Sequence, residues 1–168
     1  SYFIEDQNLG GPVQAGISIS LSTLSSLLIS LFFSQLIKSL ESYIWFFGLL
    51  LLAGGFWGLS MGNQLLIIFC STFAVGMGLG ILFPIIMLTA TENVPSHNAS
   101  TAIAIINSAS SLGIFLSPIL FSIVNRISGN RSIRFDFTIS ALIISLACII
   151  SFIYATLLKG KSPENKLH

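Results

Sequence analysis

The stretch LLIIFCSTFAVGMGLGILFPIIMLT, from Leu65 to Thr89, contains no Asp, Glu, Lys, Arg or His. It is 25 residues long, and an α-helix needs about 20 mostly apolar residues to cross the roughly 30 Å hydrocarbon core of a bilayer. An isolated β-strand would leave its backbone N–H and C=O groups unpaired in lipid, whereas a helix pairs them within the segment. The stretch therefore predicts a membrane-spanning helix.

Four further apolar runs flank this one. Two precede it, at about 12–37 and 43–60, and two follow it, at about 99–124 and 135–158. The connections between the five runs are short, which forces neighbouring helices to run antiparallel. The sequence therefore predicts an all-α fold, a polytopic transmembrane helical bundle in which five spans cover residues 12–158.

The composition excludes several classes of protein. Charged residues make up 8% of the chain, against roughly 25% in a water-soluble domain, and the mean hydropathy is +0.92. The net charge is +1 and the basic residues are scattered, so we expect no nucleic-acid partner. Cys70 and Cys148 lie in apolar runs, and His97 and His168 are isolated, so we expect no metal site and no cofactor. The runs also lack the carboxylates, histidines or Ser/Lys pair of an intramembrane enzyme, so we assign no catalytic residue.

The five runs differ in polarity. Ser, Thr, Asn and Gln occur ten times in the first run and eight times in the fourth, but once in the second. Because lipid solvates hydroxyl and amide groups poorly, we expect the first and fourth helices to face protein or a wet cavity. The second run is rich in Trp and Phe, and we expect it to face lipid.

Asn107 is the one strongly polar side chain near the middle of a run. Helical spacing puts Asn107 on one face with Ser100 and Ser111, and Ser108 follows it directly. These four residues are our candidates for the substrate path. The alternative interpretation is that Asn107 forms a hydrogen bond to a neighbouring helix. Small residues occupy the opposite face, namely Ala109, Gly113 and Ser117.

Glycines and prolines mark candidate hinge or packing positions. Gly76 and Gly80 precede Pro84, and Gly113 precedes Pro118. Small residues at intervals of four let helix backbones approach closely. A proline inside a helix removes one backbone hydrogen bond and produces a kink, which transporters use as a gating point and other membrane helices contain as a static bend. Both interpretations stay open for these five residues.

The third and fourth runs together carry a family pattern. Its segments are Gly76-Met-Gly-Leu-Gly-Ile-Leu-Phe-Pro84, Glu92-Asn-Val-Pro95, residues 99–104 and Leu112-Gly-Ile-Phe-Leu-Ser-Pro118. This pattern resembles the tenth and eleventh helices of major facilitator superfamily transporters, and residues 2–16 resemble the approach to their eighth helix. The resemblance covers nearly the whole chain. It implies that the five runs are helices eight to twelve of a twelve-helix fold, with the N-terminal half of the protein missing from this sequence.

Two loops depart from the family pattern. The loop between helices eight and nine often carries an acidic–basic signature that ends in arginines, and here it reads Gln35-Leu-Ile-Lys-Ser-Leu-Glu41. The loop after helix ten often has a basic residue after its Val-Pro, and here Ser96-His-Asn98 follows. The gating contacts that these signatures make in the family are therefore not carried over to this chain.

The resemblance also implies a topology. Residues 1–11 would be an extracytoplasmic segment, and residues 159–168 a cytoplasmic tail. The four lysines on the side of the tail outnumber the three arginines on the other side, which agrees with a cytoplasmic C-terminus. We expect an integral protein of a bacterial plasma membrane.

The function that the resemblance implies is transport of a small solute by alternating access in a secondary, ion-coupled transporter. The runs contain few polar anchors, which suits a hydrophobic or amphiphilic solute and favours efflux. The expected partners are the lipid bilayer, the small-molecule substrate and the N-terminal half of the same protein. No carboxylate lies deep in a run, so either the coupling group would lie in that half or the protein would be a uniporter. The alternative function is that of a non-transporting membrane scaffold or subunit.

Overall fold

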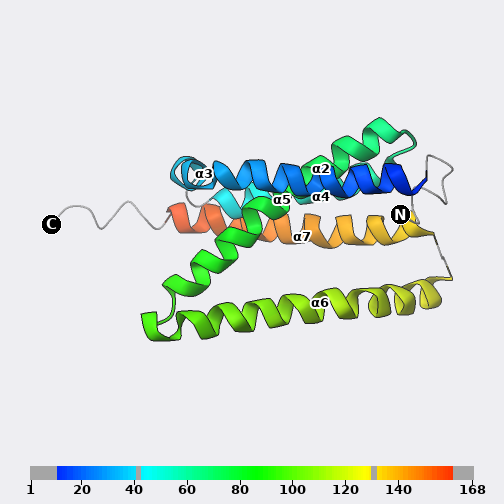
Figure 1. The fold of residues 1–168 in the computed structure, drawn as a ribbon. Helices are drawn as coiled ribbons and strands as arrows, with labels where there is room; N and C mark the ends of the chain where they lie inside the picture. Colours follow the sequence, from blue (N-terminus) through cyan, green and yellow to red (C-terminus); the bar gives the residue numbers. More distant parts are fainter. Residues whose placement is uncertain (1–10, 41–42, 130–131, 161–168) are drawn as a thin grey trace.

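The chain folds into helices throughout the part that the computed structural model describes, residues 11–40, 43–129 and 132–160 (Figure 1). The helices are α2 (Pro12–Leu31), α3 (Phe33–Leu40), α4 (Ile44–Met61), α5 (Leu65–Glu92), the short 3-10 helix η2 (Ser96–Asn98), α6 (Ala99–Ser128) and α7 (Ile133–Gly160). Within these ranges five helices are long and apolar enough to span a membrane. The predicted all-α transmembrane fold is confirmed. The proposed segments 1–11 and 159–168 lie outside the described residues except at their inner ends.

The first predicted run, 12–37, is not one continuous helix. α2 begins at Pro12 and ends at Leu31, where Phe32 adopts φ −94° and ψ 5°. α3 then packs its apolar side against the core, while its polar residues, Lys38 among them, are exposed. A helix with one apolar and one polar side suits the interface between lipid and water better than the bilayer centre. The other four long helices begin within two residues of their predicted starts.

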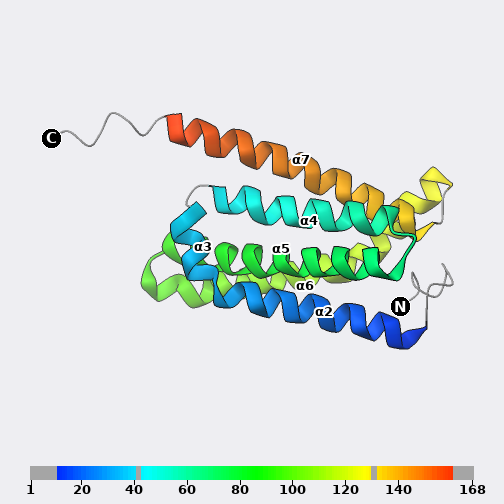
Figure 2. The same ribbon diagram turned by 90° about the horizontal axis from the view of Figure 1, so that it is seen from above.

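Four of the spanning helices form a layer. Figure 2 shows the order α2, α5, α4, α7 across this layer, and the main helix contacts are those between the neighbours in this order. α5 slants across the layer and leads to α6, which lies apart from it (Figure 1). The chain therefore builds a four-helix layer and one separate helix.

Glycines bring α5 close to the helices on both of its sides. A Cβ atom added at Gly80 would lie 2.6 Å from the carbonyl oxygen of Ser26 in α2. A Cβ atom at Gly78 would lie 2.8 Å from Leu52 Cγ and 2.9 Å from the carbonyl oxygen of Gly48 in α4. Because real Cβ atoms do not approach other atoms this closely, the two interfaces require glycine at these positions. The helix backbones therefore pack against each other directly, as small residues allow in membranes.

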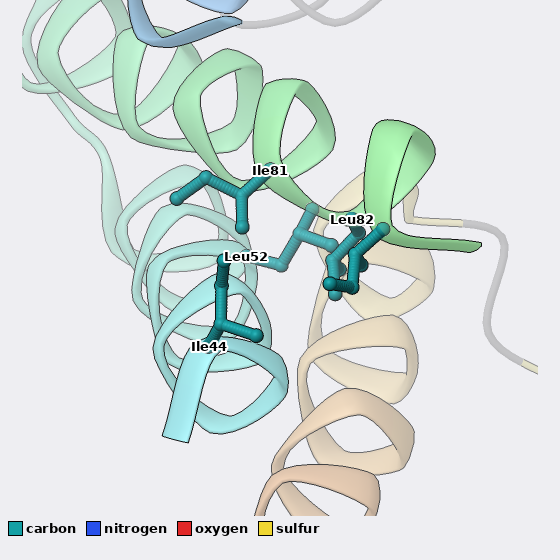
Figure 3. Packing of buried hydrophobic residues seen from close by; sticks show 5 residues of the cluster. Ile44, Leu52, Ile81 and Leu82 are labelled. Carbon is teal, nitrogen blue, oxygen red and sulfur yellow. The ribbon is translucent and has the colours of Figure 1, made fainter. Parts of the chain in front are cut away.

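An apolar cluster joins α4 to α5. Ile44 and Leu52 of α4 meet Ile81 and Leu82 of α5, and each of the four side chains is at most 8% exposed (Figure 3). Side chains from α3 pack around this cluster. The cluster places the beginning of α4 against the second half of α5.

Polar side chains link α4 to α7. The indole Nε1 of Trp57 donates to Ser145 Oγ at 3.2 Å, and the hydroxyl oxygens of Ser60 and Thr138 lie 2.6 Å apart in a hydrogen bond. The second run was expected to face lipid, but α4 lies between α5 and α7 and contributes six buried residues. That expectation is wrong for most of the helix. Tryptophan turns inward here because Ser145 supplies an acceptor for its N–H.

Removal of the Trp57–Ser145 hydrogen bond is expected to destabilise the protein modestly. Hydrogen bonds between membrane helices contribute about 0.6 kcal/mol on average and rarely more than 1.7 kcal/mol. A double-mutant cycle of Trp57→Phe and Ser145→Ala, measured as unfolding free energy by titration with a denaturing detergent, should give a coupling energy in that range. Ser110→Ala, at an exposed position of α6, is the control and should leave the free energy unchanged. Fully additive effects of the two substitutions would contradict the assigned bond.

Candidate functional site

α6 is the most exposed of the spanning helices. None of its residues is buried. Besides the adjoining 3-10 helix η2, the helix that α6 contacts most is α5 (Figure 1). The helix is nevertheless regular from Ala99 to Ser128, and Gly129, with φ +67°, ends it in the left-handed conformation that commonly closes a helix. A spanning helix with so little packing presents nearly all of its surface to whatever surrounds the described helices.

The four candidate residues of the substrate path all lie on α6 and are all exposed. They are Ser100, Asn107, Ser108 and Ser111. Among the described residues, Asn107 has no hydrogen-bond partner, so the hydrogen bond to a neighbouring helix is not formed with any of them. On the other side of α6, Ala102 and Ile106 line a cavity of about 530 Å³ together with residues of α5. The side of α6 that faces α5 is therefore not the side that carries Asn107.

The five hinge or packing candidates lie in different surroundings. Gly76 and Gly80 are buried, and Cβ atoms added at them would meet backbone atoms of α2. Pro84 is half-buried, and α5 continues through it as a helix. Gly113 has no atom within 4 Å of the position that its Cβ would take, and α6 continues through the exposed Pro118. The close contacts with another helix are therefore made by Gly76 and Gly80 of α5.

A polar cavity of about 840 Å³ lies between the end of α6 and the beginning of α7. Asn125, Arg126 and Asp136 line it, together with the candidate Pro118. The Oδ1 atoms of Asn125 and Asp136 are both buried, and neither has a hydrogen-bond partner. Unpaired buried acceptors are costly, so these two atoms favour a polar or cationic group, or water, in the cavity.

The amino-acid sequence of the chain identifies the family to which it belongs. Residues 2–167 match the sequence model described as Major Facilitator Superfamily. The chain belongs to the major facilitator superfamily. This superfamily consists of membrane transporters that act on small solutes, and the resemblance of the third and fourth runs to it is confirmed. No curated protein and no solved structure matches the chain.

In this member of the major facilitator superfamily, sequence reasoning missed the cavity between α6 and α7. Asp136 lies in the first turn of α7, its Oδ1 is buried, and it lines this cavity together with residues of α6. Arg134 tethers the same end of α7, since its Nη2 donates to Asn63 Oδ1 at 2.6 Å and to the carbonyl oxygen of Gly62 at 3.2 Å. The alternation of charged and aromatic residues at the start of this run was the available signal.

Proposed function

We propose that this chain transports a small solute by alternating access, as the C-terminal part of a twelve-helix secondary transporter. The proposal assigns the five spans to helices eight to twelve and leaves the N-terminal half as the missing partner. The observation that carries it is the exposed polar face of α6 in a chain of this superfamily. A face with an amide and several hydroxyls is unfavourable in lipid, so it calls for a wet cavity or another part of the protein.

The contrast between α5 and α6 supports this assignment. α5 is fixed by glycine contacts to α2 and α4, whereas α6 packs on little of the described chain. A helix that borders a substrate cavity needs one free polar face and neighbours that can move relative to it. We propose Asn107 as the main polar anchor of the solute, with Ser100, Ser108 and Ser111 beside it. We propose Pro84 and Pro118 as the points at which α5 and α6 bend between states.

Direction, coupling and topology belong to the same proposal. An apolar chain with few polar anchors suits a hydrophobic solute and hence efflux, driven by an ion gradient. Asp136 lies in the first turn of α7, away from mid-membrane, so the coupling carboxylate is assigned to the remaining helices. We propose that the protein lies in a bacterial plasma membrane with its C-terminal tail in the cytoplasm and residues 1–11 outside.

Cysteine accessibility tests alternating access without knowledge of the solute. Cys70 and Cys148 are first replaced in the complete reading frame, and Asn107→Cys is introduced. Because the proposed cavity opens to each side in turn, a membrane-impermeant maleimide should label position 107 in both right-side-out and inverted vesicles. A protonophore that collapses the ion gradient should change the two labelling rates in opposite directions.

Ala109→Cys provides the matched control, because Ala109 lies on the face of α6 opposite to Asn107. Its labelling should be much slower than that of Asn107→Cys from both sides. Absence of labelling at position 107 from either side would contradict the transport cavity and favour a scaffold in a dry environment. Labelling from both sides at rates that ignore the gradient would contradict alternating access and indicate a static pore.

A further inference from the structure

A third cavity lies at the end of the layer where α4 begins and α7 ends, and no residue of α6 or α2 lines it. Its volume is about 900 Å³, and most of its wall is apolar. The lining residues come from α3, α4, α5 and α7, and they include Ile37, Ile44, Trp45, Ile85 and Ile150. Figure 2 shows α3 beside the beginning of α4 at this end, where α7 also ends. The cavity is thus separate from the proposed transport face.

Small residues of α7 make room for this cavity. Ala147, Ser151 and Ala155 recur at intervals of four and line it together, so they share one face of α7. Close by, the ring of Phe152 packs against Phe46 of α4 at a centroid distance of 5.0 Å and against Tyr43 at 6.5 Å. These aromatic contacts hold α7 on α4, so the recess between them is a feature of the packed interface.

The lining of the cavity includes polar side chains, one of which carries a positive charge. Lys38 stands in the last turn of α3, is exposed, and is the charged residue among those that line the cavity. Ser151 and Tyr154 of α7 add two hydroxyl groups. α3 is an amphipathic helix whose polar side is exposed, which places Lys38 where lipid headgroups meet water.

We infer that this cavity binds a membrane phospholipid with an anionic headgroup. One acyl chain would lie in the apolar recess against α4 and α7, and the phosphate would pair with Lys38. The inference rests on the positive charge of Lys38 in the lining, on an apolar wall beside the amphipathic helix α3, and on the spanning helices that place this protein in a bilayer. Basic residues beside spanning helices attract anionic headgroups, and basic pockets between such helices bind them.

Native mass spectrometry of the full-length protein tests this site with two probes of equal acyl chains, phosphatidylglycerol and phosphatidylcholine. One lysine near the headgroup region should make phosphatidylglycerol bind about fivefold more tightly than phosphatidylcholine. Lys38→Gln should remove that preference by weakening phosphatidylglycerol binding most. Phosphatidylcholine carries the same phosphate but no net charge, so its binding should fall less. Arg126→Gln, which removes an exposed positive charge from the end of α6, should retain the preference.

Filling of the recess tests the acyl-chain site. Ala147→Leu should weaken the binding of both lipids, because the leucine side chain would occupy the space of the acyl chain. Thr156→Leu, at an exposed position on another face of α7, should bind both lipids like the unmodified protein. An unchanged preference in Lys38→Gln, or equal losses in Lys38→Gln and Arg126→Gln, would overturn the site. Unchanged binding in Ala147→Leu, in a sample whose Tm equals that of the parent, would overturn it as well. These measurements follow lipid binding and not transport, so their outcome is independent of whether the proposed transport function is correct.

Discussion

Replacement of Gly76 or Gly80 by alanine is expected to destabilise the protein clearly, because neither position has room for a methyl group. At Gly80 the new Cβ would lie 2.6 Å from the carbonyl oxygen of Ser26, and at Gly76 it would meet the carbonyl oxygen of Ser22 and the hydroxyl of Ser25. Backbone atoms cannot rotate away as a long side chain can, so α2 and α5 must separate.

The hydroxyl of Ser25 has little freedom to yield, because Ser25 is fully buried and its Oγ donates to the carbonyl oxygen of Ser22 at 2.8 Å. Overpacking of this kind costs about 1–3 kcal/mol per substitution. Each kcal/mol lowers Tm by about 2–4 °C for a domain of this size. Intrinsic fluorescence of Trp45 and Trp57 during heating in detergent would measure the shift. Gly76→Ala and Gly80→Ala together should give a larger shift than either alone.

Gly54→Ala and Gly113→Ala are the matched controls for this loss. Neither position has an atom within 4 Å of the added Cβ, and alanine favours helix over glycine by up to about 1 kcal/mol. Both variants should therefore melt at or above the Tm of the parent. If Gly76→Ala and Gly80→Ala have the same Tm as these two controls, the close contact between α2 and α5 is contradicted.

Replacement of Asn107 by leucine is expected to lower transport about 5- to 30-fold. That range corresponds to the loss of one hydrogen bond to a solute in a desolvated site, worth roughly 1–2 kcal/mol. Leucine is close to asparagine in size and suits a membrane helix, so the variant should be inserted normally. The assay is efflux of preloaded ethidium, as an amphiphilic probe, from energised cells that express equal amounts of each variant.

Asn93→Leu controls for the change of residue type. Asn93 follows the end of α5, where its Nδ2 donates to the carbonyl oxygen of Thr89 at 2.7 Å, and it lies outside the proposed solute path. This variant should transport at the rate of the parent. If Asn107→Leu transports at the same rate as Asn93→Leu, Asn107 is not the anchor of the solute. Cells without the protein set the background, and efflux at that background by the unmodified protein would show that ethidium is not a substrate.

The fold could be predicted from the sequence because each spanning helix has its own long apolar run. The run from Leu65 to Thr89 is mostly apolar and contains no charged residue, and α5 begins at Leu65 as predicted. The end of α2 at Leu31 could not be predicted in the same way, because Phe32 and Phe33 continue the apolar pattern. The break reflects the packing of α3 on the core, which is a tertiary contact.

The partners of each helix were harder to predict than its existence. The Trp and Phe residues of α4 suggested lipid, yet Trp57 reaches Ser145, which lies 88 residues away in the sequence. Gly54, Gly58 and Gly62 recur at intervals of four, but a Cβ added at Gly54 would meet no neighbouring helix, whereas one at Gly58 or at the adjacent Gly55 would meet α5. For the candidate site, helical spacing grouped Ser100, Asn107 and Ser111, whereas the burial of Asp136 Oδ1 depends on how α6 and α7 meet.

The link between α4 and α7 has a consequence for biosynthesis. Trp57 leaves the ribosome 88 residues before Ser145, and Ser60 leaves it 78 residues before Thr138. At about 5–20 residues per second, α4 waits on the order of 4–18 s for its second neighbour. During that time the indole N–H and the hydroxyl of α4 have no partner from α7, while α5, which follows α4 directly, emerges first and can pack on the other side. The nascent protein therefore passes through an insertion intermediate in which one side of α4 is open to lipid, to insertion factors and to membrane proteases.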